Sequence, residues 1–196
     1  MPSIERAHIA LPVTDATIGI SIHDITVAQY ILAGKEGVII VINKWDQIKE
    51  ITDLPKEIQE FSMRNPDVME QYLSYIQWKL DFLPWAPAIF VSAKTGKNVE
   101  KILTLVDQAN ESRNQRIETG KLNKFVTMIT TQHKPTGTKT IVPKISYATQ
   151  VAVDPPHFVF FVNKKEAFHF SYLRYLENKI REKFSYAGTS IVIELR

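Results

Sequence analysis

The 196-residue sequence contains no cysteine and no long apolar run. Without thiols, the chain cannot form disulfides or zinc–thiolate sites, and its five histidines show neither HxxxH nor HExxH spacing, so we predict no metal site. No apolar stretch approaches the roughly 18 residues that a membrane-spanning helix needs, and residues 1–6 do not begin a secretory signal. We therefore expect a cytoplasmic protein that does not enter a membrane.

Glycine is scarce as well, and none of the seven glycines lies in a GxxxxGKS/T sequence. That sequence forms the loop that wraps nucleotide phosphates in P-loop proteins. A DxxG sequence, which lies near the γ-phosphate and Mg²⁺ in such proteins, is absent too. Because phosphoryl transfer depends on the placement of phosphates and metal, we predict no such activity for these 196 residues alone.

Charge is divided unevenly along the chain. Residues 1–116 hold 12 Lys plus Arg against 15 Asp plus Glu, a net charge of −3, whereas residues 117–196 hold 12 against 6, a net charge of +6. A basic segment attracts phosphate backbones through Coulomb forces and counterion release. An ordinary solvated lysine surface gives the same count, so charge alone leaves both interpretations open.

The first 116 residues alternate apolar runs with helical patterns. Continuous apolar runs, typical of parallel strands buried on both faces, lie at residues 8–13, 37–42 and 88–91. Helical spacing occurs near residues 22–33, 66–82 and 98–114. This βαβαβα order predicts an α/β fold with a parallel sheet and right-handed crossovers. We expect Gly34 to cap the first helix, and Pro12 to mark either a sheet edge or a bulge.

The pattern changes after residue 116. A helical stretch near residues 122–129 precedes two strand-like runs, and a second helix and a last strand follow; these elements lie at 144–151, 157–162, 171–184 and 191–195. The αββαβ order predicts a separate α+β domain over residues 117–196. We expect Phe158, Phe160 and Phe161 to be core residues rather than base-stacking ones.

Two polar loops follow two of the predicted parallel strands, and ligands of open parallel sheets bind at such carboxyl ends. The first loop is Asn43-Lys44-Trp45-Asp46. The Asp46 carboxylate can accept from the N1 proton and the 2-amino group of guanine together, a paired contact that adenine cannot make. Asn43 can contact the other edge of the purine or tie neighbouring loops, and the alkyl stem of Lys44 can lie over the base.

The second loop, Ser92-Ala93-Lys94, complements the first. We expect the Ala93 backbone N–H to donate to the guanine 6-oxo group, while Ser92 and Lys94 brace the base pocket. A single NKxD match is weak evidence, but two such loops after successive strands favour a guanine-binding site over ordinary turns.

With these loops the sequence resembles the C-terminal part of the EngA/Der family, bacterial GTPases with two tandem G domains and a KH-like domain. Similarity to the second G domain is carried by Ile4-Glu5-Arg6-Ala7, Asp15-Ala16-Thr17, Asn43-Lys44-Trp45-Asp46, Leu80-Asp81-Phe82-Leu83, Ala86-Pro87 and Ser92-Ala93-Lys94-Thr95-Gly96-Lys97. Similarity to the KH-like domain is carried by Tyr147-Ala148-Thr149-Gln150-Val151, Pro155-Pro156, residues 158–163, residues 168–172 and residues 174–178.

The resemblance implies a partial P-loop-type G domain over residues 1–116 and a KH-like domain over residues 117–196. It also implies binding of GTP or GDP, with Mg²⁺ in the intact family member, and a role in assembly of the large ribosomal subunit. Because the phosphate-binding elements are missing, we expect a chain truncated at its N-terminus that binds nucleotide weakly or not at all. Whether it acts as an enzyme stays open.

Partners follow from the same resemblance. We expect the basic C-terminal domain to bind the ribosome or a precursor of large-subunit rRNA, and the missing N-terminal half is a second candidate partner. A non-catalytic adaptor that binds rRNA or the ribosome is the alternative function. KH domains clamp RNA with a GxxG loop, which residues 117–196 lack. The family's KH-like domain lacks this loop too.

An insertion relative to the family is expected near residues 51–70, with no role assigned.

Overall fold

The computed structural model describes residues 7–61, 67–136 and 142–196. Residues 4–6, residues 62–66 of the expected insertion and Gly137 lie outside the described residues. The chain forms two compact units, Met1–Asn110 with Ala187–Thr189, and Glu111–Tyr186 with Ser190–Arg196. The domain boundary expected between residues 116 and 117 stays a prediction. No helix in the described ranges is both long enough and apolar enough to cross a membrane.

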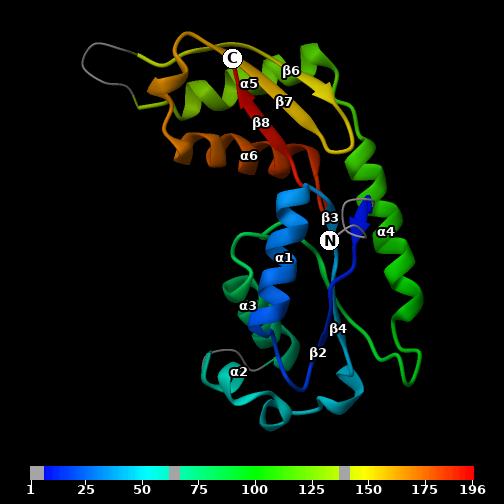
Figure 1. The fold of residues 1–196 in the computed structure, drawn as a ribbon. Helices are drawn as coiled ribbons and strands as arrows, with labels where there is room; N and C mark the ends of the chain where they lie inside the picture. The colour runs from blue at the N-terminus through cyan, green and yellow to red at the C-terminus, as the bar shows by residue number, and fades with distance from the viewer. Residues whose placement is uncertain (1–6, 62–66, 137–141) are drawn as a thin grey trace. The chain divides into compact units, whose positions relative to one another are not determined.

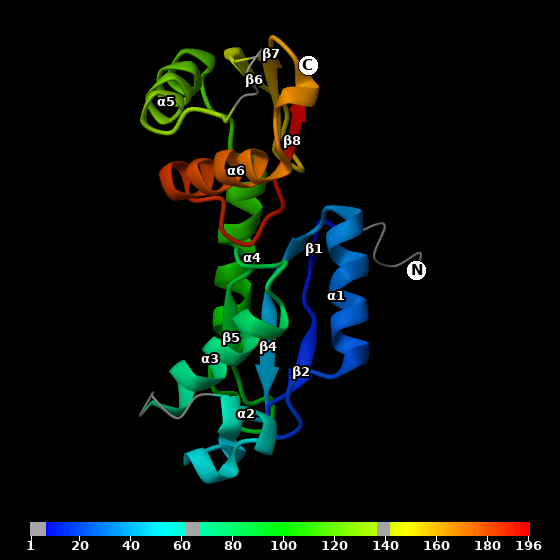
Figure 2. The same ribbon diagram turned by 90° about the vertical axis from the view of Figure 1, so that its left-hand side faces the viewer.

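The first unit contains the predicted parallel strands. β1 (Ile9–Ala10) pairs with β3 (Gly37–Val38), and a three-stranded sheet has the order β2 (Val13–Asp15), β4 (Ile40–Asn43), β5 (Ala88–Phe90). Every one of these pairings is parallel. Figure 1 traces the strands, and Figure 2 shows β4 between β2 and β5. The α/β prediction for this region is confirmed.

Pro12 explains why the first predicted strand is divided into β1 and β2. The two short strands keep one register against β3 and β4. The Pro12 carbonyl accepts from the Val41 N–H at 2.9 Å, but proline has no N–H with which to donate back. One bond of the ladder is therefore lost. Within the described residues β2 pairs only with β4, so Pro12 lies in an edge segment.

The three predicted helices are α1 (Ile22–Gly34), α3 (Val68–Lys79) and α4 (Val99–Asn114). The sequence patterns did not indicate α2 (Lys56–Phe61) or the short 3₁₀ turns η1 (Trp45–Gln47) and η2 (Ile51–Asp53). Ser21 caps α1 through a capping box with Asp24. Gly34 is the last helical residue of α1, and Lys35 is the cap residue with φ 61°. The predicted cap is therefore wrong by one residue, because a lysine tolerates the left-handed conformation here.

Strand alternation divides the core of the first unit between the two faces of its sheet. Ile40 and Ile42 pack with α1 and α3, whereas Ile39 and Val41 pack with α4. Successive strand residues point to opposite faces, so a sheet covered on both sides needs a continuous apolar run. The expected insertion joins this core, since Ile58 is fully buried.

The second unit has the predicted αββαβ order. Its elements are α5 (Thr119–Gln132), β6 (Ile145–Ala152), β7 (His157–Val162), η3 (Lys165–Ala167), α6 (Phe170–Phe184) and β8 (Val192–Leu195). The strand order is β6-β7-β8, with β6 and β7 antiparallel and β7 and β8 parallel. Figure 2 shows α5 and α6 on the same side of this sheet. The α+β prediction is confirmed.

The phenylalanines of β7 divide between the two faces of the sheet. Phe158 and Phe160 are fully buried in the core formed with α5 and α6, as predicted. The prediction for Phe161 is wrong, because this side chain is 39% exposed and its ring lies 5.8 Å from that of Tyr147. Strand alternation carries Phe161 to the face opposite the helices.

Candidate nucleotide-binding site

The two predicted loops are neighbours because β4 and β5 are adjacent parallel strands. Asn43 joins them: its Oδ1 accepts from the Ala93 N–H at 3.0 Å and from the Lys44 N–H at 2.8 Å. A second link runs from the Trp45 N–H to the Val91 carbonyl at 3.0 Å. The sequence left two roles open for Asn43, a contact with the purine edge and a tie between neighbouring loops. The structure contains the tie.

The same bonds fix the orientation of the Asn43 amide. Two N–H donors point at one atom, so that atom must be the oxygen. The Asn43 NH₂ group makes no hydrogen bond within the described residues. It can therefore donate to a ligand acceptor, such as N7 of a purine.

Lys44 is held by Asp15, at the carboxyl end of β2. The Lys44 ammonium lies 2.6 Å from Asp15 Oδ2, while Asp15 Oδ1 accepts from the Thr17 N–H at 2.9 Å and the Thr17 hydroxyl at 2.7 Å. Burial tends to raise the pKa of Asp15, but the hydrogen bonds from Lys44 and Thr17 outweigh it and hold the pKa below its usual value.

The sequence reasoning did not assign Asp15 to the site. The signal was its position: Asp15 and Asn43 are register partners across β2 and β4. That partnership requires the strand register, which sequence patterns alone do not supply.

Trp45 anchors the turn that carries Asp46. Its ring is buried, 4.2 Å from that of Phe90 and 5.5 Å from that of Tyr72. Asp46 follows on η1 and is partly exposed. Among the residues that the structure describes, the Asp46 side chain has no hydrogen bond and no ion pair. A carboxylate on a fixed turn is thus left with both oxygens available to a ligand.

In the second loop, Ser92 is buried and its Oγ accepts from the Thr95 N–H at 3.2 Å, so this side chain braces the loop itself. The Ala93 N–H, expected to donate to the guanine 6-oxo group, donates to Asn43 instead. That contact with guanine stays a prediction and requires the existing bond to be shared or exchanged. The exposed Lys94 has a backbone N–H with no partner in the described part of the chain.

Two cavities of the structure lie away from these loops. The larger, of about 540 Å³, belongs to the second unit, and another of about 180 Å³ lies beside α3. Neither is lined by residues 43–46 or 92–94. The candidate site is therefore defined by its pattern of donors and acceptors: an available carboxylate at Asp46, an available amide NH₂ at Asn43 and a lysine held by Asp15.

Comparison with known proteins gives two family matches. Residues 2–112 match the elongation factor Tu GTP binding domain, and residues 116–196 match the KH-domain-like of EngA bacterial GTPase enzymes, C-terminal. Among relatives, the GTPase Der of Caldanaerobacter subterraneus subsp. tengcongensis is 40% identical over 196 residues, which is 100% of this chain and 42% of that protein.

The GTPase Der of Thermoanaerobacter pseudethanolicus is 38% identical over 196 residues, again 100% of this chain and 42% of the relative. That of Lachnospira eligens is 41% identical over 189 residues, 96% of this chain and 40% of the relative. The chain thus spans 42% of the length of the first two relatives and 40% of the third.

Proposed function

Because this chain belongs to the EngA/Der family of bacterial GTPases, we propose that its first unit binds the base of a guanine nucleotide through Asp46, Asn43 and Lys44. The observation that carries the proposal is the available Asp46 carboxylate on a turn anchored by Trp45. Guanine presents an N1 proton and a 2-amino group side by side, and one carboxylate accepts from both. Adenine lacks that pair of donors.

The other residues complete the base contacts. The NH₂ group of Asn43 donates to no acceptor among the described residues and suits N7 of the purine. The Asp15 contact holds the end of Lys44, so its alkyl stem is available to lie over the ring. Ser92 shapes the second loop, whose Ala93 and Lys94 backbone N–H groups are the candidate donors to the 6-oxo group.

Hydrolysis is not part of the proposal for these 196 residues. The sequence contains neither GxxxxGKS/T nor DxxG, so it offers no known element to hold the phosphates or Mg²⁺ that GTP hydrolysis requires. A purine held by its base alone binds weakly, and we expect a GDP dissociation constant of about 1 mM or higher, near −4 kcal/mol. Micromolar affinity would refute this part.

Asp46→Asn tests base reading directly. Asparagine offers one acceptor and one donor, so the variant should lose guanosine and gain xanthosine, whose 2-oxo group accepts. Binding is followed by NMR chemical shifts of the Trp45 indole at millimolar ligand, with adenosine as the unrelated base. Asp81→Asn, an exposed site without a partner among the described residues, is the matched control.

Equal shifts for guanosine and adenosine in the wild-type chain would overturn the base-reading proposal. Release of phosphate from GTP above background by the purified chain would overturn the claim that these residues alone do not hydrolyse GTP. The two outcomes are independent of each other.

We also propose that this chain takes part in assembly of the large ribosomal subunit. The similarity to GTPase Der proteins and the net charge of +6 over residues 117–196 support it. An N-terminal G-domain half is a further proposed partner, because the β2 edge and the start of α1 carry exposed apolar side chains at Val13, Ile18 and Ile22. Added N-terminal half should reduce aggregation of the purified chain.

The second candidate function is a non-catalytic adaptor that binds rRNA. The same charge of +6 favours it, because neutralised phosphates release counterions and make binding steeply dependent on salt. Ribosomal RNA binding by the whole chain should weaken as salt rises. Binding that does not change with salt, or no binding, would contradict an electrostatic RNA role.

A further inference from the structure

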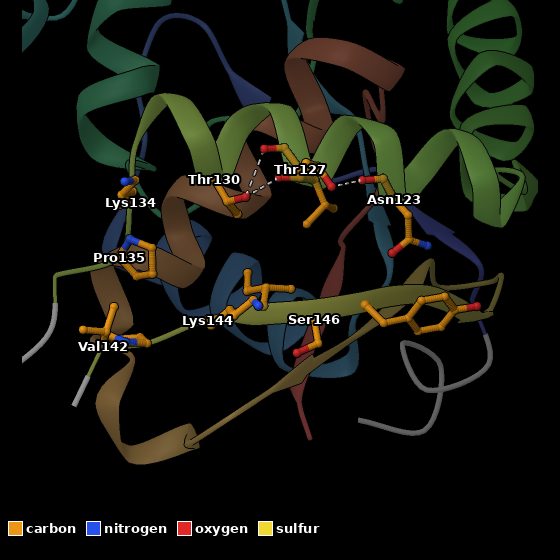
Figure 3. Close-up of a pocket in the computed structure, with 12 residues that line it drawn as sticks. Asn123, Thr127, Thr130, Lys134, Pro135, Val142, Lys144 and Ser146 are labelled. Atoms are coloured by element: carbon orange, nitrogen blue, oxygen red, sulfur yellow. Dashed lines mark hydrogen bonds between the residues drawn. The ribbon is translucent and has the colours of Figure 1, made fainter.

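A groove lies between α5 and the edge strand β6, on the second unit. Twelve residues line it and its volume is about 540 Å³, within the range of about 300–1,000 Å³ that small-molecule sites occupy. Figure 3 shows Thr127 and Thr130 on α5, across the groove from the segment that carries Lys144 and Ser146. We call this the α5–β6 groove.

One end of the α5–β6 groove is cationic. Figure 3 shows Lys134 and Lys144 at the end marked by Pro135 and Val142. Neither lysine forms an ion pair with any residue that the structure describes, whereas Arg181 of the same unit is paired with its neighbour Glu177. No acidic residue is among the twelve that line the groove. This end therefore suits an anion.

Away from the lysines, the groove offers acceptors. The Thr127 hydroxyl donates to the Asn123 carbonyl at 2.9 Å, and the Thr130 hydroxyl donates to the Val126 carbonyl at 2.8 Å. Each hydroxyl has one proton and has given it to its own helix, so only lone pairs remain for a ligand. A phosphate cannot donate to them, but a base amino group or a ribose 2′-hydroxyl can.

Apolar surface lies between these polar groups. Val126 of α5 and Ile145 of β6 line the groove, and Tyr147 is at its rim with 45% of its surface exposed. The faces of nucleobases pack against such aliphatic and aromatic surfaces. The groove thus combines two lysines, an apolar wall and two threonine hydroxyls that donate to their own helix. This is the pattern that suits a nucleotide's phosphate, base and donor groups.

We propose that the α5–β6 groove binds single-stranded RNA, with a phosphate at Lys134 and Lys144 and a base amino group or 2′-hydroxyl at Thr127 and Thr130. The inference rests on the proposed rRNA-binding function and gives it a location. The strand is single because a base packs its face on the apolar wall of the groove only when it is unstacked and unpaired, whichever donor lies at Thr127 and Thr130. An oligoglutamate peptide would satisfy the lysines, but it brings no base to pack on the apolar wall of Val126, Ile145 and Tyr147.

The test uses the whole chain and fluorescein-labelled oligoadenylate RNA in anisotropy titrations at several salt concentrations. Replacing Lys134 and Lys144 together by alanine should weaken binding about thirtyfold, which corresponds to about 1 kcal/mol for each of the two charge pairs in water. It should also reduce the salt slope by about 0.7, the contribution of the one single-strand phosphate contact that the two lysines share. The matched control is the Lys165→Ala, Lys183→Ala double variant, which loses the same charge elsewhere on this unit.

The hydroxyl contacts need their own variant. Thr127→Val with Thr130→Val keeps the shape and removes the acceptors, and should weaken oligoadenylate binding about fivefold, the loss expected from about 1 kcal/mol of hydrogen bonding. Far-UV circular dichroism melting verifies that each variant is folded. Unchanged affinity in the threonine variant overturns the base contact.

The outcomes separate the groove from the wider function. If the wild-type chain binds RNA in a salt-dependent way but both lysine double variants lose affinity equally, the groove proposal is wrong and general RNA binding stands. If the wild-type chain binds no RNA, both proposals fall. If an oligoglutamate peptide displaces the RNA at equal ionic strength, the groove is a site for acidic peptide and the RNA proposal is overturned.

Discussion

Asn43 in the first unit and Asn123 in the second each join two segments, but they use their amides differently. Asn123 uses both ends: its Nδ2 donates to the Ala148 carbonyl at 2.7 Å and to the Thr119 carbonyl at 2.8 Å, and its Oδ1 accepts from the Ala148 N–H at 2.8 Å. Asn43 accepts from two amides through its oxygen alone. The NH₂ group of Asn43 is left over.

The difference separates a structural asparagine from a candidate ligand-binding one. Among the described residues no strand pairs with this side of β6, and Asn123 takes that place beside Ala148, which is fully buried. Both protons of its NH₂ group are used, so it has no donor left. Asn43 ties its two loops together through its amide oxygen alone, and its NH₂ group stays available to a ligand. The residue type is the same in both units, so only the hydrogen-bond partners distinguish the roles.

The largest expected effect concerns the separate cores of the two units. Phe160 is fully buried in the second, and Phe160→Ala should destabilise that unit by about 3–5 kcal/mol. All three tryptophans, Trp45, Trp78 and Trp85, belong to the first unit. The urea midpoint measured by far-UV circular dichroism should therefore fall, while the midpoint measured by tryptophan fluorescence should not change.

Ile42→Ala is the reciprocal variant. Ile42 is fully buried in the first unit, so the tryptophan fluorescence midpoint should fall, by the equivalent of about 2–5 kcal/mol. If both signals shift together in both variants, the two units unfold as one, and the comparison between them loses its basis.

The two asparagines provide the next test. Asn123→Ala leaves the buried N–H and carbonyl of Ala148 without partners, so we expect a loss of about 1–3 kcal/mol in the second unit by circular dichroism. Asn43→Ala frees amides at Lys44 and Ala93, which water can reach, and should cost less than about 1 kcal/mol by tryptophan fluorescence. A larger loss at Asn43 would make its role structural too.

The smallest effect is a dependence on pH in the first unit. The pKa of Asp15 lies below its ordinary value of 3.8 in the folded chain, because of Lys44 and Thr17 and despite burial. The contact therefore contributes stability above pH 3.8, and this is lost as the pH falls through the folded pKa. Since Lys44 is half-exposed, the contribution is at most about 1 kcal/mol.

Asp15→Asn measures this contribution. The difference in the free energy of unfolding between wild type and variant, followed by tryptophan fluorescence, should shrink as the solution is acidified from pH 6 to pH 3. Asp81→Asn, which removes a carboxylate without a partner in the described ranges, should show no such trend. If the difference in the free energy of unfolding between wild type and Asp15→Asn does not change with pH, the lowered pKa of Asp15 is contradicted.

Much of the fold could be predicted from sequence because the decisive patterns are local. The continuous apolar run ending at Ile42 requires a sheet covered on both faces, and the structure has α1 and α3 on one face and α4 on the other. The family resemblance is likewise confirmed. The prediction for Phe161 failed because three aromatic residues close together on a strand cannot all face the same side.

The contacts that were not predicted depend on elements distant in sequence. The Lys44–Asp15 ion pair requires the register of β2 on β4, and the bond from Ala93 to Asn43 requires the spacing of β4 and β5. The α5–β6 groove depends on how an edge strand lies beside a helix. The roles of Asp46, Lys94 and the other site residues toward guanine stay predictions.

Pro12 has a further consequence for the exposed side of the sheet. The Pro12 carbonyl points inward, toward Val41. The N–H group that proline lacks would point to the same side, so the lost hydrogen bond is one between this strand and β4. The neighbouring residues Leu11 and Val13 direct their backbone groups the other way, to the outside of the edge. Pro12 therefore weakens the pairing of this strand with its own sheet but does not block pairing at the outer edge. The exposed N–H and carbonyl groups of that edge can still bind another strand.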